Sequence, residues 1–133
     1  MGLQNYLDLV EAELEIATAR KISDNAYFLE QNGRIFKLYQ QGKQVILEGA
    51  IGSPLKDTPE TNAMLSELLQ FNLKRTQFLD NTVFLDSDTH QLFLREVLTR
   101  EGASEEEIKA GLEDFVLNIE VIEDRFFPKP TTN

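Results

Sequence analysis

The sequence predicts an α+β fold in which helices pack against one twisted antiparallel sheet. Apolar residues recur at helical spacing near both ends of the chain, short aromatic and β-branched runs lie between them, and turn residues separate those runs. The expected order is helix, three-strand meander, helix, two-strand hairpin, helix. Apolar residues cover more than one face of the second predicted helix, too many for packing against one sheet, which predicts a dimer. We expect one domain over residues 1–127 and a flexible tail over 128–133.

The first helix is predicted over residues 3–20. Leu9 and Ile16 lie about a third of a turn away from its core-facing arc and form a second, smaller stripe. This stripe fits either a wide buried face or a contact surface for another chain. The core-facing arc consists of Leu3, Tyr6, Leu7, Val10, Leu14 and Ala17.

Three strands are predicted over residues 27–30, 35–39 and 45–48. Asn32-Gly33 between the first two favours a tight hairpin, because both central positions of such a turn need positive φ. Alternation along the strands separates Phe36, Leu38, Val45 and Leu47 from Ile35, Lys37, Tyr39, Ile46 and Glu48. Both faces are therefore partly apolar, and we expect a helix, a second subunit or a bound client to cover the outer one.

Thr58-Pro59 is typical of a helix start, and it predicts a second helix through about residue 75. A hairpin follows over residues 82–85 and 91–98. The last helix begins at a capping box of Ser104 and Glu107 and ends before Pro128. Its apolar stripe consists of Ile108, Leu112, Phe115, Val116, Ile119 and Phe126.

The composition excludes several classes of partner. The chain has 13 basic and 23 acidic residues, a net charge of −10, which argues against binding to nucleic acid or to anionic membrane surfaces. It contains no cysteine, so disulfides and thiolate chemistry are excluded. The start of the chain lacks the basic and apolar pattern of a secretory signal, and no apolar run is long enough for a transmembrane helix. These features predict a cytosolic protein.

The sequence predicts no catalytic residues, no metal site and no cofactor. His90 is the only histidine, and its place in a predicted turn with Asp86 and Asp88 fits a solvated turn better than a metal site. An EF-hand is excluded because Gln91 and Val97 occupy the positions of its glycine and its glutamate. Glu105, Glu106 and Glu107 are expected to be first-turn acids that stabilise the helix dipole.

At this point the chain resembles the class I type III secretion chaperones, the CesT or Tir chaperone family. The resemblance extends from Tyr6 to about Phe126 and depends on apolar patterns in a shared order. The chain departs from the family at His90-Gln91, where the family usually has a glycine near the turn. The matching segments are residues 45–52, 64–73, 83–94 and 112–116.

The resemblance implies a bacterial, cytoplasmic homodimer that holds the amino-terminal part of a secreted effector in extended form and helps to present it to the secretion ATPase. No nucleotide or metal is needed for that activity. An extended client can add backbone hydrogen bonds to a sheet edge and side chains to apolar pockets. We predict client contacts at Leu9, Ile16, Tyr27, Ile35, Tyr39 and Ile46, and we expect Leu9, Ile16, Ile35 and Ile46 to be accessible in the free protein. The predicted dimer interface consists of Leu65, Leu68, Leu69, Phe71 and Phe84.

Two alternatives remain open from the residues alone. One is a dimeric protein-binding or regulatory module of the same fold without a role in secretion. The other is an enzyme whose site is built from scattered carboxylates. A deep polar pocket around a carboxylate with a perturbed pKa would favour the enzyme.

Overall fold

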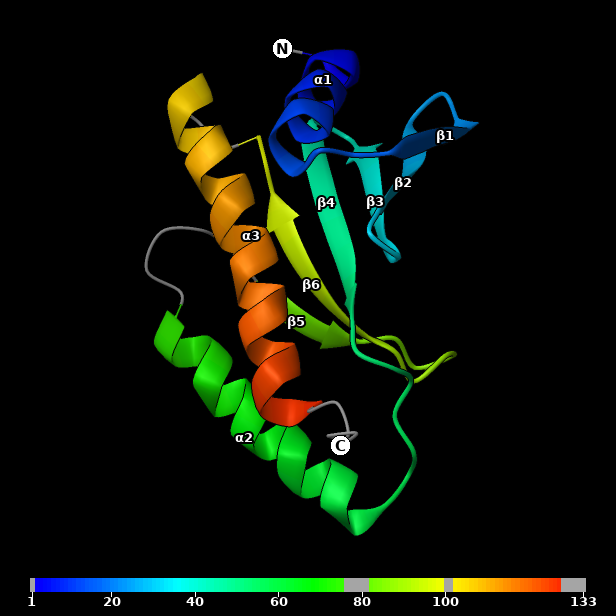
Figure 1. Cartoon of the computed structure of the whole chain (residues 1–133), viewed down its shortest axis with the longest axis vertical. Helices are drawn as coiled ribbons and strands as arrows, with labels where there is room; N and C mark the ends of the chain where they lie inside the picture. The colour runs from blue at the N-terminus through cyan, green and yellow to red at the C-terminus, as the bar shows by residue number, and fades with distance from the viewer. Residues whose placement is uncertain (1, 76–81, 100–101, 128–133) are drawn as a thin grey trace.

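The computed structural model describes residues 2–75, 82–99 and 102–127; within helix α2, the side chains of residues 69 and 71–75 lie outside the described part. The α+β class is confirmed, with three helices and a six-stranded sheet of order β1-β2-β3-β4-β6-β5, in which every neighbouring pair is antiparallel (Figure 1). The elements are α1 (Leu3–Leu14), β1 (Thr18–Ser23), β2 (Ala26–Gln31), β3 (Arg34–Gln41), β4 (Gln44–Ile51), α2 (Pro59–Arg75), β5 (Thr82–Leu85), β6 (Leu92–Val97) and α3 (Glu105–Phe126).

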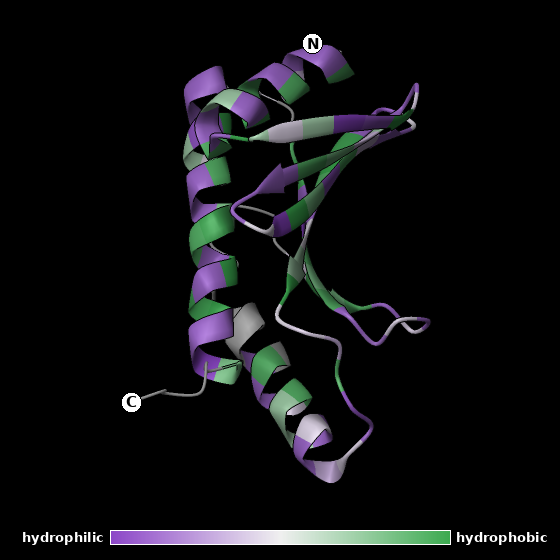
Figure 2. Ribbon diagram, turned by 45° about the vertical axis from the view of Figure 1, so that its right-hand side comes forward, coloured by the Kyte–Doolittle hydropathy of each residue, from purple (hydrophilic) through white to green (hydrophobic). Residues whose placement is uncertain are grey.

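The sheet has one face covered by α1 and α3 and one face on which the described part of the chain places no helix (Figure 2). Alternation assigns the strands to these faces as the sequence predicts. The four residues expected on the inner face, Phe36, Leu38, Val45 and Leu47, are all buried in the core. Apolar residues of α1 and α3 complete this core: Tyr6, Leu7, Val10, Leu14, Ile108, Leu112, Phe115, Ile119 and Ile122.

The prediction of a first helix through residue 20 is wrong, because α1 ends at Leu14 and a fourth strand, β1, precedes the predicted meander. Glu15 adopts the left-handed conformation at φ 51° and ψ 52°, and this conformation ends the helix. The side-chain amide of Gln31 then donates a hydrogen bond to the carbonyl of Leu14, and the N–H of Ala17 bonds to Glu30. These tertiary bonds outweigh the helical propensity of the Ala19-Arg20-Lys21 run.

The turns and caps explain where the other elements begin and end. Asn32 and Gly33 both have positive φ, 50° and 81°, which confirms the predicted tight hairpin. Ser104 Oγ accepts a hydrogen bond from the N–H of Glu107 at 3.2 Å and caps α3. His90 has a φ of 58°, so histidine occupies a left-handed position of the second hairpin, the kind of position for which glycine is suited.

Close approach of α3 to the sheet depends on Gly49 in β4. A Cβ atom at this position would lie 2.8 Å from Ile119 Cδ1 and 2.9 Å from Phe36 Cδ1. Glycine therefore lets the core side chains of α3 and β3 meet over the middle of β4. The predicted tail over residues 128–133 lies outside the described residues.

Candidate partner-binding surfaces

The outer face of the sheet carries a transverse row of side chains that crosses five strands in register. Arg20 pairs with Phe28, Phe28 with Lys37, Lys37 with Glu48, and Glu48 with Arg95. Residues opposite one another in antiparallel strands point to the same face. The row therefore places four charged side chains and the ring of Phe28 side by side on the helix-free face.

Hydrogen bonds and aromatic contacts join this row to its neighbours. Tyr39 Oη donates a hydrogen bond to Glu48 Oε2 at 2.5 Å, and the guanidinium of Arg95 contacts the same oxygen at 3.0 Å through both Nε and Nη2. Burial, followed by the hydrogen bond to Glu48, raises the pKa of Tyr39 to about 12. The phenol therefore stays protonated at neutral pH and remains a hydrogen-bond donor to the carboxylate.

Aromatic rings also support the cations of the outer face. The guanidinium carbon of Arg20 lies 5.6 Å from the ring centroid of Phe28, and Lys37 Nζ lies 4.9 Å from that of Tyr39. Arg95 lies 4.7 Å from the ring of Phe84. The ring of Phe84 in turn stacks on Phe93 at 5.4 Å between the ring centroids. Such contacts hold flexible cationic side chains flat against the sheet.

The predicted client-contact residues do not form one continuous surface. Ile35 lies on the outer face with 58% of its surface exposed, and Tyr39 is half-buried beside it on β3. Ile46 is also on the outer face, but it is only 3% exposed, so the prediction that it is accessible is wrong. Tyr27 pairs with the core residue Leu38 and points to the inner face, so its assignment to the outer face is also wrong.

Leu9 and Ile16 are half-buried and pack against the core instead of forming an open stripe. Ile16 lies after the end of α1, in the link to β1, because the helix is shorter than predicted. Leu9 lines a shallow cleft between α1 and the start of α3, together with Asp8 and Lys109. The exposed large apolar side chains of the first three strands are instead Ile22, Phe28 and Ile35.

The residues predicted for the dimer interface also divide into different environments. Leu68 is 1% exposed within the single chain and belongs to its core, so its assignment to a surface available for dimerisation is wrong. Leu65 and Phe84 are half-buried, with Phe84 on the outer face beside Arg95. The side chains of Leu69 and Phe71 lie outside the described residues.

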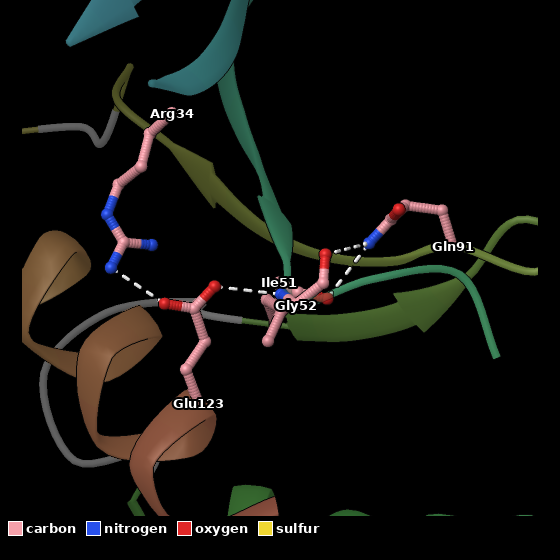
Figure 3. Close-up of polar contacts among 5 residues, drawn as sticks. All are labelled: Arg34, Ile51, Gly52, Gln91 and Glu123. Atoms are coloured by element: carbon pink, nitrogen blue, oxygen red, sulfur yellow. Dashed lines mark hydrogen bonds and ion pairs between the residues drawn. The ribbon is translucent and has the colours of Figure 1, made fainter. Parts of the chain in front are cut away.

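A second polar site joins the end of α3 to the β4–α2 loop (Figure 3). Glu123 forms an ion pair with Arg34 at 2.7 Å through Oε1 and accepts a hydrogen bond from the N–H of Gly52 at 2.8 Å through Oε2. The amide of Gln91 donates to the carbonyls of Ile51 and Gly52 at 2.9 and 3.0 Å. Four segments that are distant in the sequence are thus held together.

Gly52 occupies a position in this network that other residues cannot easily take. Its φ is +61°, and a Cβ atom here would lie 2.6 Å from the ring of Phe127. An open cleft of about 900 Å³ borders the network and is lined partly by Glu120 and Asp124. Sequence reasoning missed Arg34, Gln91 and Glu123, because long-range polar contacts leave no local pattern.

Glu123→Ala is expected to lower the free energy of unfolding by about 1 to 3 kcal/mol, because it removes a partly buried ion pair and leaves the Gly52 N–H without its acceptor. Urea unfolding followed by far-UV circular dichroism measures this loss. Asp124→Ala is the matched control, since Asp124 is the exposed neighbour on the same helix. An equal loss in both variants would show that the network does not stabilise the fold.

One buried carboxyl has the perturbed pKa that the enzyme alternative requires. Glu96 on β6 is 1% exposed, its Oε2 has no hydrogen-bond partner among the described residues, and burial, with a smaller contribution from Asp114, raises its pKa to about 8. Neither of the two clefts described above is lined by Glu96. The carboxyl is buried away from solvent, which fits a core position better than an active site.

Within residues 2–75, 82–99 and 102–127, no group of three or more histidine, aspartate or glutamate side chains is arranged to hold a metal ion. In the same ranges, no helix is long and apolar enough to cross a bilayer.

A known protein family matches most of the chain. The sequence model of the Tir chaperone protein (CesT) family matches residues 23–122. The matched range begins at the last residue of β1 and ends within α3, so it includes β2 to β6 and the whole of α2. A comparison with curated proteins found no match.

Proposed function

Because the chain belongs to the Tir chaperone protein (CesT) family of type III secretion chaperones, we propose that it keeps a secreted effector in an extended, secretion-competent form. As a member of this family it binds effector proteins and is not an enzyme. We also propose that residues 1–127 form one chaperone domain. This domain binds the amino-terminal segment of the effector in the bacterial cytoplasm. Delivery of that segment to the secretion ATPase completes the proposed role.

The observation that best supports this role is the exposed apolar surface at the first three strands. Ile35 is 58% exposed, Ile22 46% and Phe28 36%, and they belong to the neighbouring strands β3, β1 and β2. Strand β1 forms one edge of the sheet and all six of its residues are exposed. An extended segment can pair with such an edge through backbone hydrogen bonds while its apolar side chains cover the face beside it.

Ile35→Asp is expected to weaken retention of an effector's amino-terminal segment at least about tenfold, because a carboxylate would have to be desolvated against the apolar client. The free energy of unfolding should change by no more than about 1 kcal/mol, because Ile35 is exposed in the free protein. Pull-down of the co-expressed segment, paired with a thermal melt, measures both quantities.

Leu117→Asp is the matched control for this test. Leu117 is 53% exposed, but it lies on α3 and not on the outer sheet face. Full retention by the Leu117 variant and loss by the Ile35 variant are expected. Equal retention by both would place the client on another surface.

We further propose that the chaperone is a homodimer whose interface includes Leu65, Leu69, Phe71 and Phe84. Leu65 and Phe84 are half-buried in the single chain and can bury more surface against a second subunit. Sedimentation equilibrium at micromolar concentration should give the mass of two chains. A mass of one chain under these conditions contradicts the proposal.

A further inference from the structure

The charge on the outer face of the sheet differs in sign from the charge of the whole chain. The outward positions of the paired strands carry the cations Arg20, Lys37 and Arg95, against the carboxylates Glu30 and Glu48. The whole chain has 13 basic and 23 acidic residues. A segment that lies on this face therefore meets a locally cationic surface on a strongly anionic protein.

Among the described residues, two of these cations have no carboxylate within ion-pair distance. Arg95 is paired with Glu48, but in the described part of the chain neither Arg20 nor Lys37 forms an ion pair. Each instead lies over an aromatic ring, Arg20 over Phe28 and Lys37 over Tyr39. A cation held on a ring keeps its charge available to a further partner, and the ring offers that partner an apolar contact.

The two free cations lie close enough to contact one bound segment. Arg20 on β1 and Lys37 on β3 are both in register with Phe28 on β2. Neighbouring strands are about 4.8 Å apart, so the two backbones are separated by about 10 Å. Ile35, on the same face two residues before Lys37, adds the exposed apolar position that such a segment would cover.

We infer that this face selects an extended client segment that carries aspartate or glutamate among its apolar residues. Carboxylates of the segment would pair with Arg20 and Lys37, and its apolar side chains would cover Phe28 and Ile35. The surrounding anionic surface repels the same segment elsewhere, so the local cations set its position and orientation. This inference names the chemistry of the client and rests on the proposed chaperone function.

The test uses fluorescently labelled peptides of about twelve residues with identical valine and leucine positions, whose remaining positions are all glutamate, all lysine or all glutamine. Fluorescence anisotropy with the full chain should give at least about tenfold tighter binding of the glutamate peptide than of the lysine peptide at low salt. The difference should shrink as the salt concentration rises, because the contacts are solvent-exposed. Equal affinities for the glutamate and lysine peptides, or no binding of either, would overturn the inference.

Two double variants distinguish the face from the overall field of the protein. Arg20→Glu with Lys37→Glu should reverse the preference, and Arg20→Gln with Lys37→Gln should abolish it. The control is Lys21→Glu with Lys109→Glu, which changes the net charge as much as the reversal does. Lys21 lies beside Arg20 on β1 and pairs with Asp24, and Lys109 is on α3. If this control removes the preference as strongly as the reversal does, the inference is wrong.

Retention of a co-expressed effector segment is measured separately on the same variants. If unmodified protein retains the segment but shows no charge preference for the peptides, the inference fails and the proposed function stands. If it prefers the glutamate peptide but retains no effector segment, the proposed function fails. The two failures are therefore distinguishable.

Discussion

Leu68→Glu is expected to unfold the subunit, with a loss of more than about 4 kcal/mol in the free energy of unfolding. Leu68 is 1% exposed in the single chain and belongs to its main core cluster. The substitution removes a packed side chain and buries a carboxylate in a core cluster whose described members include no cation. Far-UV circular dichroism in a urea titration should show a chain without a cooperative folded baseline.

The matched control introduces the same residue at an exposed position of the same helix. Ser66 is exposed on α2, so Ser66→Glu should change the free energy of unfolding by no more than about 0.5 kcal/mol. A folded Leu68→Glu chain that has only lost its dimeric state would contradict this expectation. It would show that Leu68 lies in a subunit interface and not in the core of one chain.

Leu68 also shows what periodicity can and cannot decide. Apolar residues on several faces of α2 predict a subunit interface, and within the single chain α2 contacts α3 and β5. The pattern cannot tell which surface belongs to the same chain, because burial against α3 and burial against a second subunit require the same residue types. The error therefore concerns the partner of the residue and not the helix itself.

Local signals predicted the ends of several elements well. The Asn32-Gly33 turn and the Ser104 cap are observed as expected, since each depends on residues only a few positions apart. The end of α1 was missed because it depends on Gln31, which contacts Leu14 from 17 positions away. The prediction that Tyr27 lies on the outer face is wrong. The prediction that its neighbours on β3 and β4 lie on the inner face is correct.

The candidate site was predictable only in part for the same reason. Strand alternation predicts that Ile35 is exposed. The burial of Ile46 depends on how the neighbouring strands and their side chains pack around it, which alternation does not show. Pairing of Arg95 with Glu48 depends on the β4–β6 register across 47 positions. The sequence alone does not show which charged residues share one face of the sheet. The transverse row of side chains is therefore recognised only in the folded structure.

The unmodified protein is expected to lose stability as the pH rises from about 5 to about 8. Glu96→Gln is expected to abolish this loss. Glu96 is buried on the inner face, and its pKa is raised from 4.5 to about 8, mainly by burial and secondarily by Asp114. The folded state therefore holds a proton that the unfolded state releases above its pKa near 4.5. Because the folded state binds more protons in this window, stability falls as pH rises and levels off above about pH 8.

The difference between the two pKa values corresponds to a loss of at most about 5 kcal/mol, and relaxation of the core around the charged form will reduce it. Urea unfolding at a series of pH values between 5 and 9 measures the fall. Glu96→Met should be more stable than the unmodified protein at pH 8, because it replaces an unpartnered polar group with an apolar one of similar volume.

Glu120→Gln is the control, since Glu120 is an exposed carboxylate on α3 and its replacement should leave the pH profile unchanged. A fall of equal size in the unmodified protein and in Glu96→Gln would mean that another group causes the pH dependence. In that case Glu96 has a partner in solution that keeps it charged within the fold.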